Sequence, residues 1–318
     1  MFMDIKTILV ASPLHTHMKE MIEKRGALTE FTMIYRDPEA VTEDDVARAD
    51  AFVAFTRPAH VDLSAFQWVH SLGAGVDKLM KDISWPEGVF LTRTVTSFGE
   101  KISEYVLSYL LVHTQKHRDF ETLQKNKEWT FLPPEPLNTK RALIFGTGEI
   151  GSVLARTLSG LGVHVTGVSR SGEEKPYFGE VIFPDKASTA LTNRLAAADL
   201  IVNTMPLTEE TKAYFDGRFF QGAFESLFIN VGRGESVVDE DLLQALEQGQ
   251  LREAVLDVFS EEPLPQSHPF WEHPAVHITP HISAITTAEE GLDCFLNTVS
   301  KLKEGTPLTN EADPARGY

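Results

Sequence analysis

Short apolar runs alternate with weaker helical patterns in the first hundred residues of the chain. The runs are rich in Val, Ile, Leu or Phe and each is followed by turn or polar residues; they are Thr7–Val10, Phe52–Phe55, Trp68–Leu72 and Val89–Arg93. Such runs are typical of strands buried on both faces of a parallel sheet. Helical patterns at His17–Arg25 and Thr42–Ala49 lie between them. The pattern predicts a small open α/β unit.

Beyond residue 140 the alternation of strand and helix becomes regular. Arg141–Phe145 is apolar, a helical stripe runs from Ile150 to Leu161, and Val163–Val168 is apolar again. The series continues with strand patterns at Leu200–Thr204, Leu227–Val231, Ala254–Phe259 and Val276–Thr279 and a helical pattern at Asp241–Glu247. This order predicts a doubly wound parallel sheet.

Two features lie between these regions. Ser103–His113 is dense in apolar residues and predicts a long, largely buried helix. Phe131–Pro136 carries three prolines, which neither a helix nor a central strand tolerates. We expect it to connect two structural units.

Composition narrows the class of protein. A length of 318 residues suits about two domains. The formal charge of -17 argues against a nucleic acid or an anionic membrane as partner, and it means that an anionic substrate needs a local positive site. Cys294 is the only cysteine, which excludes an internal disulfide and a thiolate metal cluster. The start of the chain lacks the basic segment of a leader peptide, so we expect a cytoplasmic protein.

A glycine motif follows the strand pattern at Arg141–Phe145. Its residues are Gly146, Thr147, Gly148, Glu149, Ile150 and Gly151. A G-x-G-x-x-G run that follows a strand and opens a helix permits a tight turn, close approach of a pyrophosphate, and binding of that pyrophosphate at the helix N-terminus. The motif predicts a dinucleotide site.

The end of the next strand pattern bears on which dinucleotide binds. A site for NAD usually places an acidic residue there, to bind the ribose 2′-hydroxyl. Here Ser169, Arg170 and Ser171 follow Val168, and Arg170 suits a 2′-phosphate. We expect NADPH (NADP) to be preferred, with NADH (NAD) possible; an ordinary surface arginine is the alternative.

Three later segments place polar residues where an apolar strand ends. They contain Arg233, Glu262 after Asp257, and His281. The carboxyl ends of parallel strands line the ligand site of a doubly wound sheet, so these side chains should converge near a bound nicotinamide. Taken singly, each has a plainer explanation as a turn, an ion pair or a structural histidine.

These segments, with the glycine motif, resemble the D-isomer-specific 2-hydroxyacid dehydrogenase family. Leu72-Gly-Ala-Gly-Val-Asp77, Ser103-Glu-Tyr-Val106 and Met205-Pro-Leu-Thr208 also fit its signature, in the same order over most of the chain. The end of the second strand at Ser169–Ser171 and the lack of a C-terminal extension are similar to the glyoxylate/hydroxypyruvate reductase branch. An extended phosphoglycerate dehydrogenase fits less well.

The resemblance implies an oxidoreductase that transfers hydride between NAD(P)H and a small 2-keto acid. It implies that His281 is the general acid, that Glu262 orients it and keeps it protonated, and that Arg233 binds the substrate carboxylate and polarises the carbonyl. Further cofactor contacts are implied for Met205, Pro206, Val231 and Asp257. Backbone N–H groups of the Leu72, Gly73, Ala74, Gly75 and Val76 turn would bind the substrate carboxylate. Arg57, after a strand of the first unit, is a candidate for substrate selection or simply a surface charge.

The resemblance also implies an organisation into two α/β domains, Rossmann-like or flavodoxin-like, with parallel doubly wound sheets and a cleft between them. Residues 1–106 plus 286–318 would form the substrate domain, and 107–285 the dinucleotide domain. Family members usually pair through the cofactor domain, so we expect a homodimer in which Ser103–His113 and its polar continuation take part.

Three alternatives compete with this hypothesis. His268, His273, His277 and His281 lie close together, but prolines break up their segment and no cysteine supports them, which disfavours a metal site. A non-catalytic dinucleotide-sensing protein on the same fold is the main rival. A formate dehydrogenase fits worse, because that branch pairs its histidine with Gln where this chain has Glu262.

Overall fold

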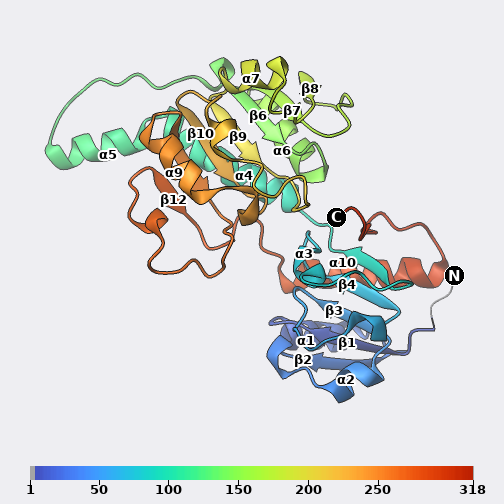
Figure 1. Cartoon of the computed structure of the whole chain (residues 1–318). Helices are drawn as coiled ribbons and strands as arrows, with labels where there is room; N and C mark the ends of the chain where they lie inside the picture. Colours follow the sequence, from blue (N-terminus) through green and yellow to red (C-terminus); the bar gives the residue numbers. More distant parts are fainter. Residues whose placement is uncertain (1–3, 318) are drawn as a thin grey trace. The chain divides into compact units, whose positions relative to one another are not determined.

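The computed structural model describes residues 4–317, which divide into two compact units (Figure 1). The chain up to Thr96 and again from Thr286 forms one, named the split unit; Ser97–Ile285 form the other, named the central unit. Both are α/β units with parallel sheets, as the strand and helix patterns predict. The cleft expected between them stays a prediction.

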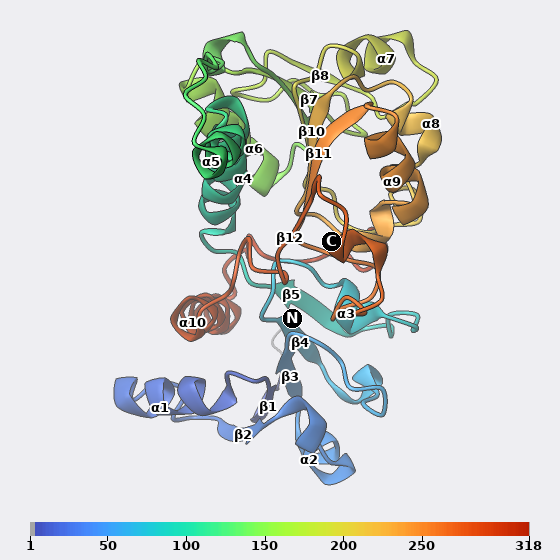
Figure 2. The ribbon, with the colours of Figure 1, turned by 90° about the vertical axis from the view of Figure 1, so that its left-hand side faces the viewer.

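The split unit is built on a five-stranded parallel sheet within the described residues, in the order β2-β1-β3-β4-β5. Its elements are β1 (Thr7–Ala11), α1 (His15–Arg25), β2 (Thr32–Arg36), α2 (Glu43–Arg48), β3 (Ala51–Ala54), β4 (Trp68–Ser71), α3 (Asp77–Met80), β5 (Phe90–Arg93) and α10 (Ala288–Glu304). This is the flavodoxin-like strand order, in which the direction of winding reverses beside β1. Helices α1 and α10 cover one face, and α2 and α3 the other (Figure 2).

The central unit contains a seven-stranded parallel sheet among its described residues, in the order β12-β11-β10-β9-β6-β7-β8. Its elements are α4 (Phe98–Thr114), α5 (His117–Asn126), β6 (Arg141–Phe145), α6 (Glu149–Gly160), β7 (His164–Val168), β8 (Glu180–Ile182), α7 (Thr189–Leu195), β9 (Leu200–Asn203), α8 (Gly217–Phe220), β10 (Ser226–Asn230), α9 (Asp239–Glu247), β11 (Leu251–Leu256) and β12 (Val276–Ile278). Figure 2 shows α4, α5 and α6 on one side of the sheet and α7, α8 and α9 on the other. The central strands are therefore buried on both faces, which explains their unbroken apolar sequence.

The structure corrects two expectations about boundaries. The division expected after residue 106 falls inside α4, which belongs wholly to the central unit, so the chain passes between units at Thr96–Ser97 instead. Helix α4 packs closely on α6: a Cβ added to Gly99 would lie 2.7 Å from the Cβ of Val153. The proline-rich segment 131–136 does not connect the two units, because it joins α5 to β6 within the central unit.

Candidate functional site

The glycine motif lies where the winding of the central sheet reverses. Strands β7 and β8 extend the sheet to one side of β6, and β9, β10, β11 and β12 extend it to the other. Ligands of doubly wound sheets bind at the carboxyl ends of the strands at such a point. The turn after β6 is therefore positioned for a dinucleotide.

The three glycines of the motif meet different steric demands. Gly146 has a φ of +99°, which favours glycine, and its N–H donates to the carbonyl of Val168. A Cβ on Gly151 would lie 1.9 Å from the carbonyl oxygen of Gly146, so only glycine lets α6 come this close to β6. A Cβ on Gly148 would meet no described atom within 4 Å. The backbone at Gly148 is thus open to a ligand, while the other two glycines shape the turn.

The first turn of α6 contains the rest of the motif. Glu149 and Ile150 begin the helix, and Gly148 precedes it without a side-chain cap. Thr147 is nearly buried, and its carbonyl accepts a hydrogen bond from the hydroxyl of Ser152. Uncapped N–H groups at the end of a twelve-residue helix suit a pyrophosphate. The turn therefore fits a dinucleotide phosphate by both shape and charge.

The segment after β7 contains the residues predicted to contact the 2′ position of the ribose in the dinucleotide. The hydroxyls of Ser169 and Ser171 lie 3.3 Å apart, and Arg170 is half exposed. An Arg170 Nη1 lies 3.8 Å from a carboxylate oxygen of Glu210, which also accepts a hydrogen bond from Thr208. Sequence reasoning did not consider Glu210, which lies two residues beyond the Met205–Thr208 motif in the loop after β9.

Buried asparagines organise the loops after β9 and β10. Asn203 ends β9, and its amide nitrogen donates to the side chains of Asn230 at 2.9 Å and Ser236 at 2.8 Å. Its side-chain oxygen accepts the N–H of Met205. The predicted cofactor contacts Met205, Pro206 and Val231 thus follow two neighbouring strands at the same edge of the sheet. Polar Asn at the ends of two otherwise apolar strands is the signal that identifies this network.

Two nearby side chains donate hydrogen bonds to the backbone carbonyl of Arg233. Its carbonyl accepts from the side-chain nitrogen of Asn230 at 3.0 Å and from the hydroxyl of Ser236 at 2.6 Å. A Cβ on Gly234 would lie 1.9 Å from the carbonyl carbon of Phe259, which shows how tightly the Arg233 turn packs on the segment after β11. The turn after β10 is therefore rigid at the residue that carries the guanidinium.

Glu262 and His281 form the pair expected from the sequence. Nδ1 of His281 lies 3.1 and 3.0 Å from the two carboxylate oxygens of Glu262, one of which accepts the N–H of Phe259. Because a carboxylate only accepts, Nδ1 carries the hydrogen of this contact. The other ring nitrogen, Nε2, forms no hydrogen bond with the described residues. In a partly exposed ring, Nε2 is then the atom that can exchange a proton with a substrate.

Asp257 fixes the segment that carries His281. Its fully buried carboxylate accepts from the hydroxyl of Thr279 at 2.5 Å and from the N–H groups of Ile282 and Ser283 at 2.8 and 2.9 Å. The hydroxyl of Thr279 is donated to Asp257, so Tyr105 must be the donor in its 2.6 Å contact with Thr279. Burial raises the pKa of Tyr105 far above its usual value, which keeps that hydrogen in place.

These hydrogen bonds leave the carboxylate of Asp257 little capacity to accept a further hydrogen bond from a cofactor. Its role toward the nicotinamide carboxamide stays a prediction. Three of about four acceptor positions on its carboxylate are already used by the chain around His281. Sequence reasoning missed this anchoring role, because it depends on β11 and β12 being neighbours.

The split unit contains the remaining predicted residues. Leu72 to Val76 follow β4, and Gly73, Ala74 and Gly75 are partly exposed. The guanidinium of Arg57 donates to the carbonyls of Ala59, Val61 and Lys81 of its own unit, which is a structural use of the side chain. A role of Arg57 toward substrate stays a prediction.

The histidines weighed as metal ligands have other partners. His268 pairs with Asp239, and His277 pairs with Glu253 and accepts from Arg118 at 2.7 Å. Within residues 4–317, no group of three or more His, Cys, Asp or Glu side chains is arranged to hold a metal ion. In the same range, no helix is both long and apolar enough to cross a membrane.

Comparison with known proteins places the chain in a family. Residues 107–283 match the model of the D-isomer specific 2-hydroxyacid dehydrogenase NAD binding domain. The glyoxylate/hydroxypyruvate reductase A of Serratia proteamaculans is 36% identical over 272 residues, which cover 82% of this chain and 86% of that protein.

Two solved structures are similar over nearly the whole chain. The NADPH-dependent glyoxylate/hydroxypyruvate reductase of Sinorhizobium meliloti, solved with NADP and sulfate, has a TM-score of 0.83 and 30% identity, covering 98% of this chain and 100% of that one. A D-isomer specific 2-hydroxyacid dehydrogenase of Xanthobacter autotrophicus, solved with NADPH and MES, has a TM-score of 0.87 and 26% identity, covering 99% and 100%. The chain therefore belongs to the D-isomer specific 2-hydroxyacid dehydrogenase family.

Proposed function

We propose that this protein is an NADPH-dependent reductase of small 2-keto acids such as glyoxylate or hydroxypyruvate. The observation that carries the proposal is the Glu262–His281 pair, which leaves Nε2 of the histidine available at the carboxyl edge of a dinucleotide-type sheet. The relatives named as glyoxylate/hydroxypyruvate reductases support the substrate class. The test is a steady-state screen of 2-keto acids with NADPH and NADH.

Three side chains have different roles in carbonyl reduction. His281 donates a proton from Nε2 to the carbonyl oxygen, while Glu262 accepts the hydrogen of Nδ1 and so fixes the orientation of the ring. Arg233 binds the carboxylate of the keto acid and polarises its carbonyl, and so supplies positive charge in a chain of net charge -17. A bound nicotinamide supplies the hydride. A dinucleotide-sensing protein, the rival hypothesis, has no need of a carboxylate-oriented histidine.

The cofactor proposal is NADPH rather than NADH. Its support is the Ser169–Ser171 segment, which offers two hydroxyls and the Arg170 guanidinium. The relatives solved with NADP or NADPH agree with it. Glu210, 3.8 Å from Arg170, would have to give up this cation to a 2′-phosphate.

Arg170→Ala is expected to raise the KM for NADPH about 10- to 100-fold and to leave that for NADH nearly unchanged. Only NADPH carries the 2′-phosphate, and a charge-assisted contact of this kind has about this effect on affinity. Arg194→Ala is the control, because Arg194 also forms a half-exposed ion pair, with Glu180, in the same unit. Equal losses for both cofactors would show that Arg170 does not select between them.

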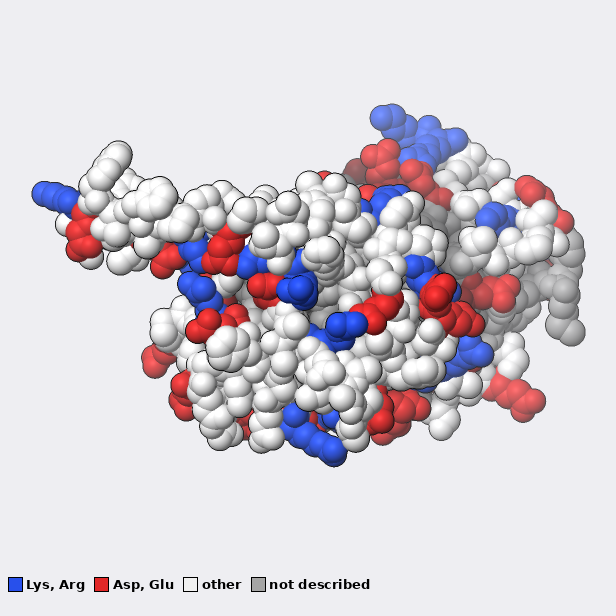
Figure 3. All heavy atoms as spheres, turned by 90° about the horizontal axis from the view of Figure 1, so that it is seen from above, with Lys and Arg blue, Asp and Glu red and all other residues white. Residues whose placement is uncertain are grey.

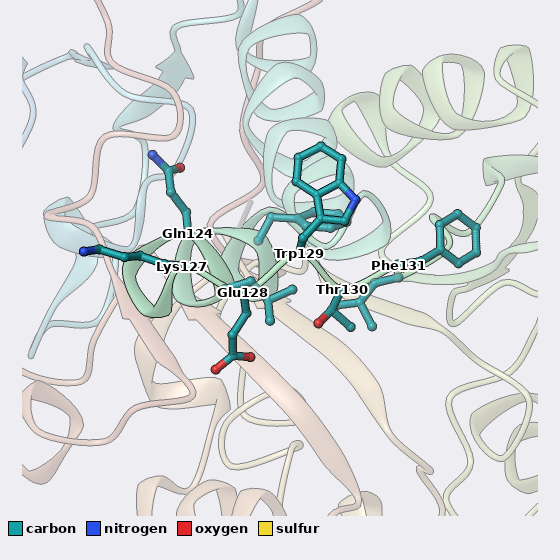
Figure 4. Close-up of a pocket in the computed structure, with 9 residues that line it drawn as sticks. Gln124, Lys127, Glu128, Trp129, Thr130 and Phe131 are labelled. Carbon is teal, nitrogen blue, oxygen red and sulfur yellow. The ribbon is translucent and has the colours of Figure 1, made fainter.

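We further propose a homodimer formed through the central unit. Figure 1 shows α5 projecting from the rest of that unit, and Figure 3 shows largely uncharged atoms on the upper side of this projection. No residue of α5 is buried, and the following segment exposes Trp129 completely and Phe131 by 87%. They border a hollow of about 660 Å³ that Phe120, Leu123 and Leu132 also line (Figure 4). Apolar exposure of this extent is typical of a surface that another chain covers.

Trp129→Ser combined with Phe131→Ser is expected to convert the dimer into a monomer, because both changes remove apolar area from the proposed interface. Sedimentation at micromolar concentration measures the change. Phe224→Ser is the control, since Phe224 is 69% exposed in the same unit outside this segment. A wild-type protein that sediments as a monomer would contradict the dimer.

A further inference from the structure

The loop 72–76 after β4 has an unequal distribution of hydrogen bonds. The carbonyls of Leu72 and Ala74 accept from the side chains of Thr286 and Arg93, respectively. That of Gly73 accepts from the N–H of Thr94, that of Gly75 from the hydroxyl of Ser71, and that of Val76 from backbone N–H groups of α3. The N–H groups of Ala74 and Gly75, in contrast, form no hydrogen bond within residues 4–317, and both residues are partly exposed. The loop therefore offers donors and hides its acceptors.

Ser71 is the residue that binds this loop at several points. Its hydroxyl lies 2.8 Å from the carbonyl oxygen of Gly75 and 3.2 Å from that of Gly73, and it accepts the N–H of Gly73 at 3.2 Å. A hydroxyl has one hydrogen to donate, so the shorter contact, to Gly75, takes it. The N–H of Gly73, which was among the predicted substrate donors, is bonded to Ser71 instead.

A chain of buried hydrogen bonds leads to Ser71, and its direction can be derived. Nε1 of Trp68 can only donate, and it donates to Oγ1 of Thr92 at 2.9 Å. At the other end of the chain, the hydroxyl of Thr94 donates its one hydrogen to the carbonyl of Ser71 at 3.0 Å, so Nε2 of His70 donates to Oγ1 of Thr94 at 3.3 Å. Nδ1 of the neutral ring then accepts from the hydroxyl of Thr92 at 2.8 Å. Each member donates once, and the chain ends on the backbone where the loop begins.

His70 can fill its place in this chain only as a neutral ring. Nδ1 accepts and Nε2 donates, so a second ring proton would face the hydroxyl hydrogen of Thr92. The ring is fully buried, and burial lowers the pKa of His70 to about 3. The ring is therefore neutral near neutral pH, which is the form that the chain requires.

We propose that Ser71 is a positioning residue that fixes the unbonded N–H groups of Ala74 and Gly75 and so makes loop 72–76 selective for a carboxylate anion. The inference rests on the proposed function and on the expectation that this loop binds the carboxylate of the 2-keto acid together with Arg233. Thr94, which is hydrogen-bonded to His70 of the buried chain, donates to the carbonyl of Ser71 and so helps to fix the position of Ser71. A peptide turn whose carbonyls are free to rotate outward would present negative as well as positive ends to an anion.

The test compares an acid with its neutral ester, because only the acid needs the N–H groups as an anion site. In Ser71→Ala, the KM for a 2-keto acid is expected to rise about tenfold, while kcat/KM for its methyl ester and the Kd for NADPH stay within about twofold. Thr94→Val, which replaces a hydroxyl by a methyl of similar shape, should lower the acid-to-ester preference in the same direction but less. Ser12→Ala is the matched control: Ser12 is a buried serine that follows β1, and it bonds the N–H of Leu14 rather than this loop.

Binding of oxamate and the acid-to-ester ratio of Thr94→Val complete the test. In the wild type, oxamate should shift the backbone amide NMR signals of Ala74 and Gly75 and neutral oxamide should not, and Ser71→Ala should weaken oxamate binding about tenfold. A wild type that reduces no keto acid would overturn the proposed function, but the oxamate titration would still test the loop. An unchanged acid-to-ester ratio in Ser71→Ala, or equal losses for acid and ester, would overturn the role of Ser71. If Ser71→Ala does not fold, an unchanged ratio in Thr94→Val overturns it.

Discussion

His281→Ala is expected to slow reduction of the keto acid by about 10²–10⁴-fold, the usual contribution of a general acid. The KM for NADPH should stay the same, since the substitution leaves the glycine turn after β6 intact. His268→Ala is the control, because His268 also contacts a carboxylate, that of Asp239, in the same unit. A variant that keeps wild-type turnover would show that His281 is not the proton donor.

A substitution at Glu262 tests the other member of the pair. Glu262→Gln keeps a hydrogen-bonding group next to Nδ1 of His281 but replaces the carboxylate 3.0 Å away by an amide, which can donate as well as accept. We expect kcat to fall, by up to about 10⁴-fold, because the tautomer and orientation of the ring are then no longer fixed. A Glu262→Gln variant with the kcat of the wild type would contradict this role of the carboxylate.

Arg233→Ala is expected to lower kcat/KM by about 10²–10³-fold, the scale seen when a group that stabilises developing charge on an oxygen is removed. Both KM and kcat should change, because the guanidinium contacts the substrate in the ground state and in the transition state. Arg252→Ala is the control, as Arg252 is an exposed arginine near the start of β11. A change in KM alone would restrict Arg233 to substrate binding.

Strands buried on both faces could be predicted from sequence because their apolar runs are unbroken. Strand β6 was predicted at its observed bounds, Arg141–Phe145. Strand β2 was not expected: it lies at a sheet edge, and only one of its residues, Ile34, is buried, so polar residues interrupt its apolar pattern. The short strand β8 has no fully buried residue. Helix α5 was not expected for the same reason, since none of its residues enters the core.

Part of the candidate site could likewise be predicted from the sequence, and part could not. The glycine motif, Arg233, Glu262 and His281 could be found from sequence because each lies in a short segment next to a strand, and the Glu262–His281 contact is present in the structure. The hydrogen-bond partners of Asp257, and the chain from Trp68 to Ser71, link residues on neighbouring strands. Which strands are neighbours is a property of the fold, so no local pattern predicts these contacts.

Transfer of isotope from cofactor to product tests the central claim most directly. The purified protein is mixed with a 2-keto acid and NADPH that carries deuterium at the transferable position of the nicotinamide. The account predicts one D-2-hydroxy acid formed for each NADPH oxidised, with the deuterium at C2 of the product, and no such product from His281→Ala on the same timescale. NADPH that binds but is not oxidised by any small 2-keto acid would contradict the account and favour a dinucleotide-sensing protein.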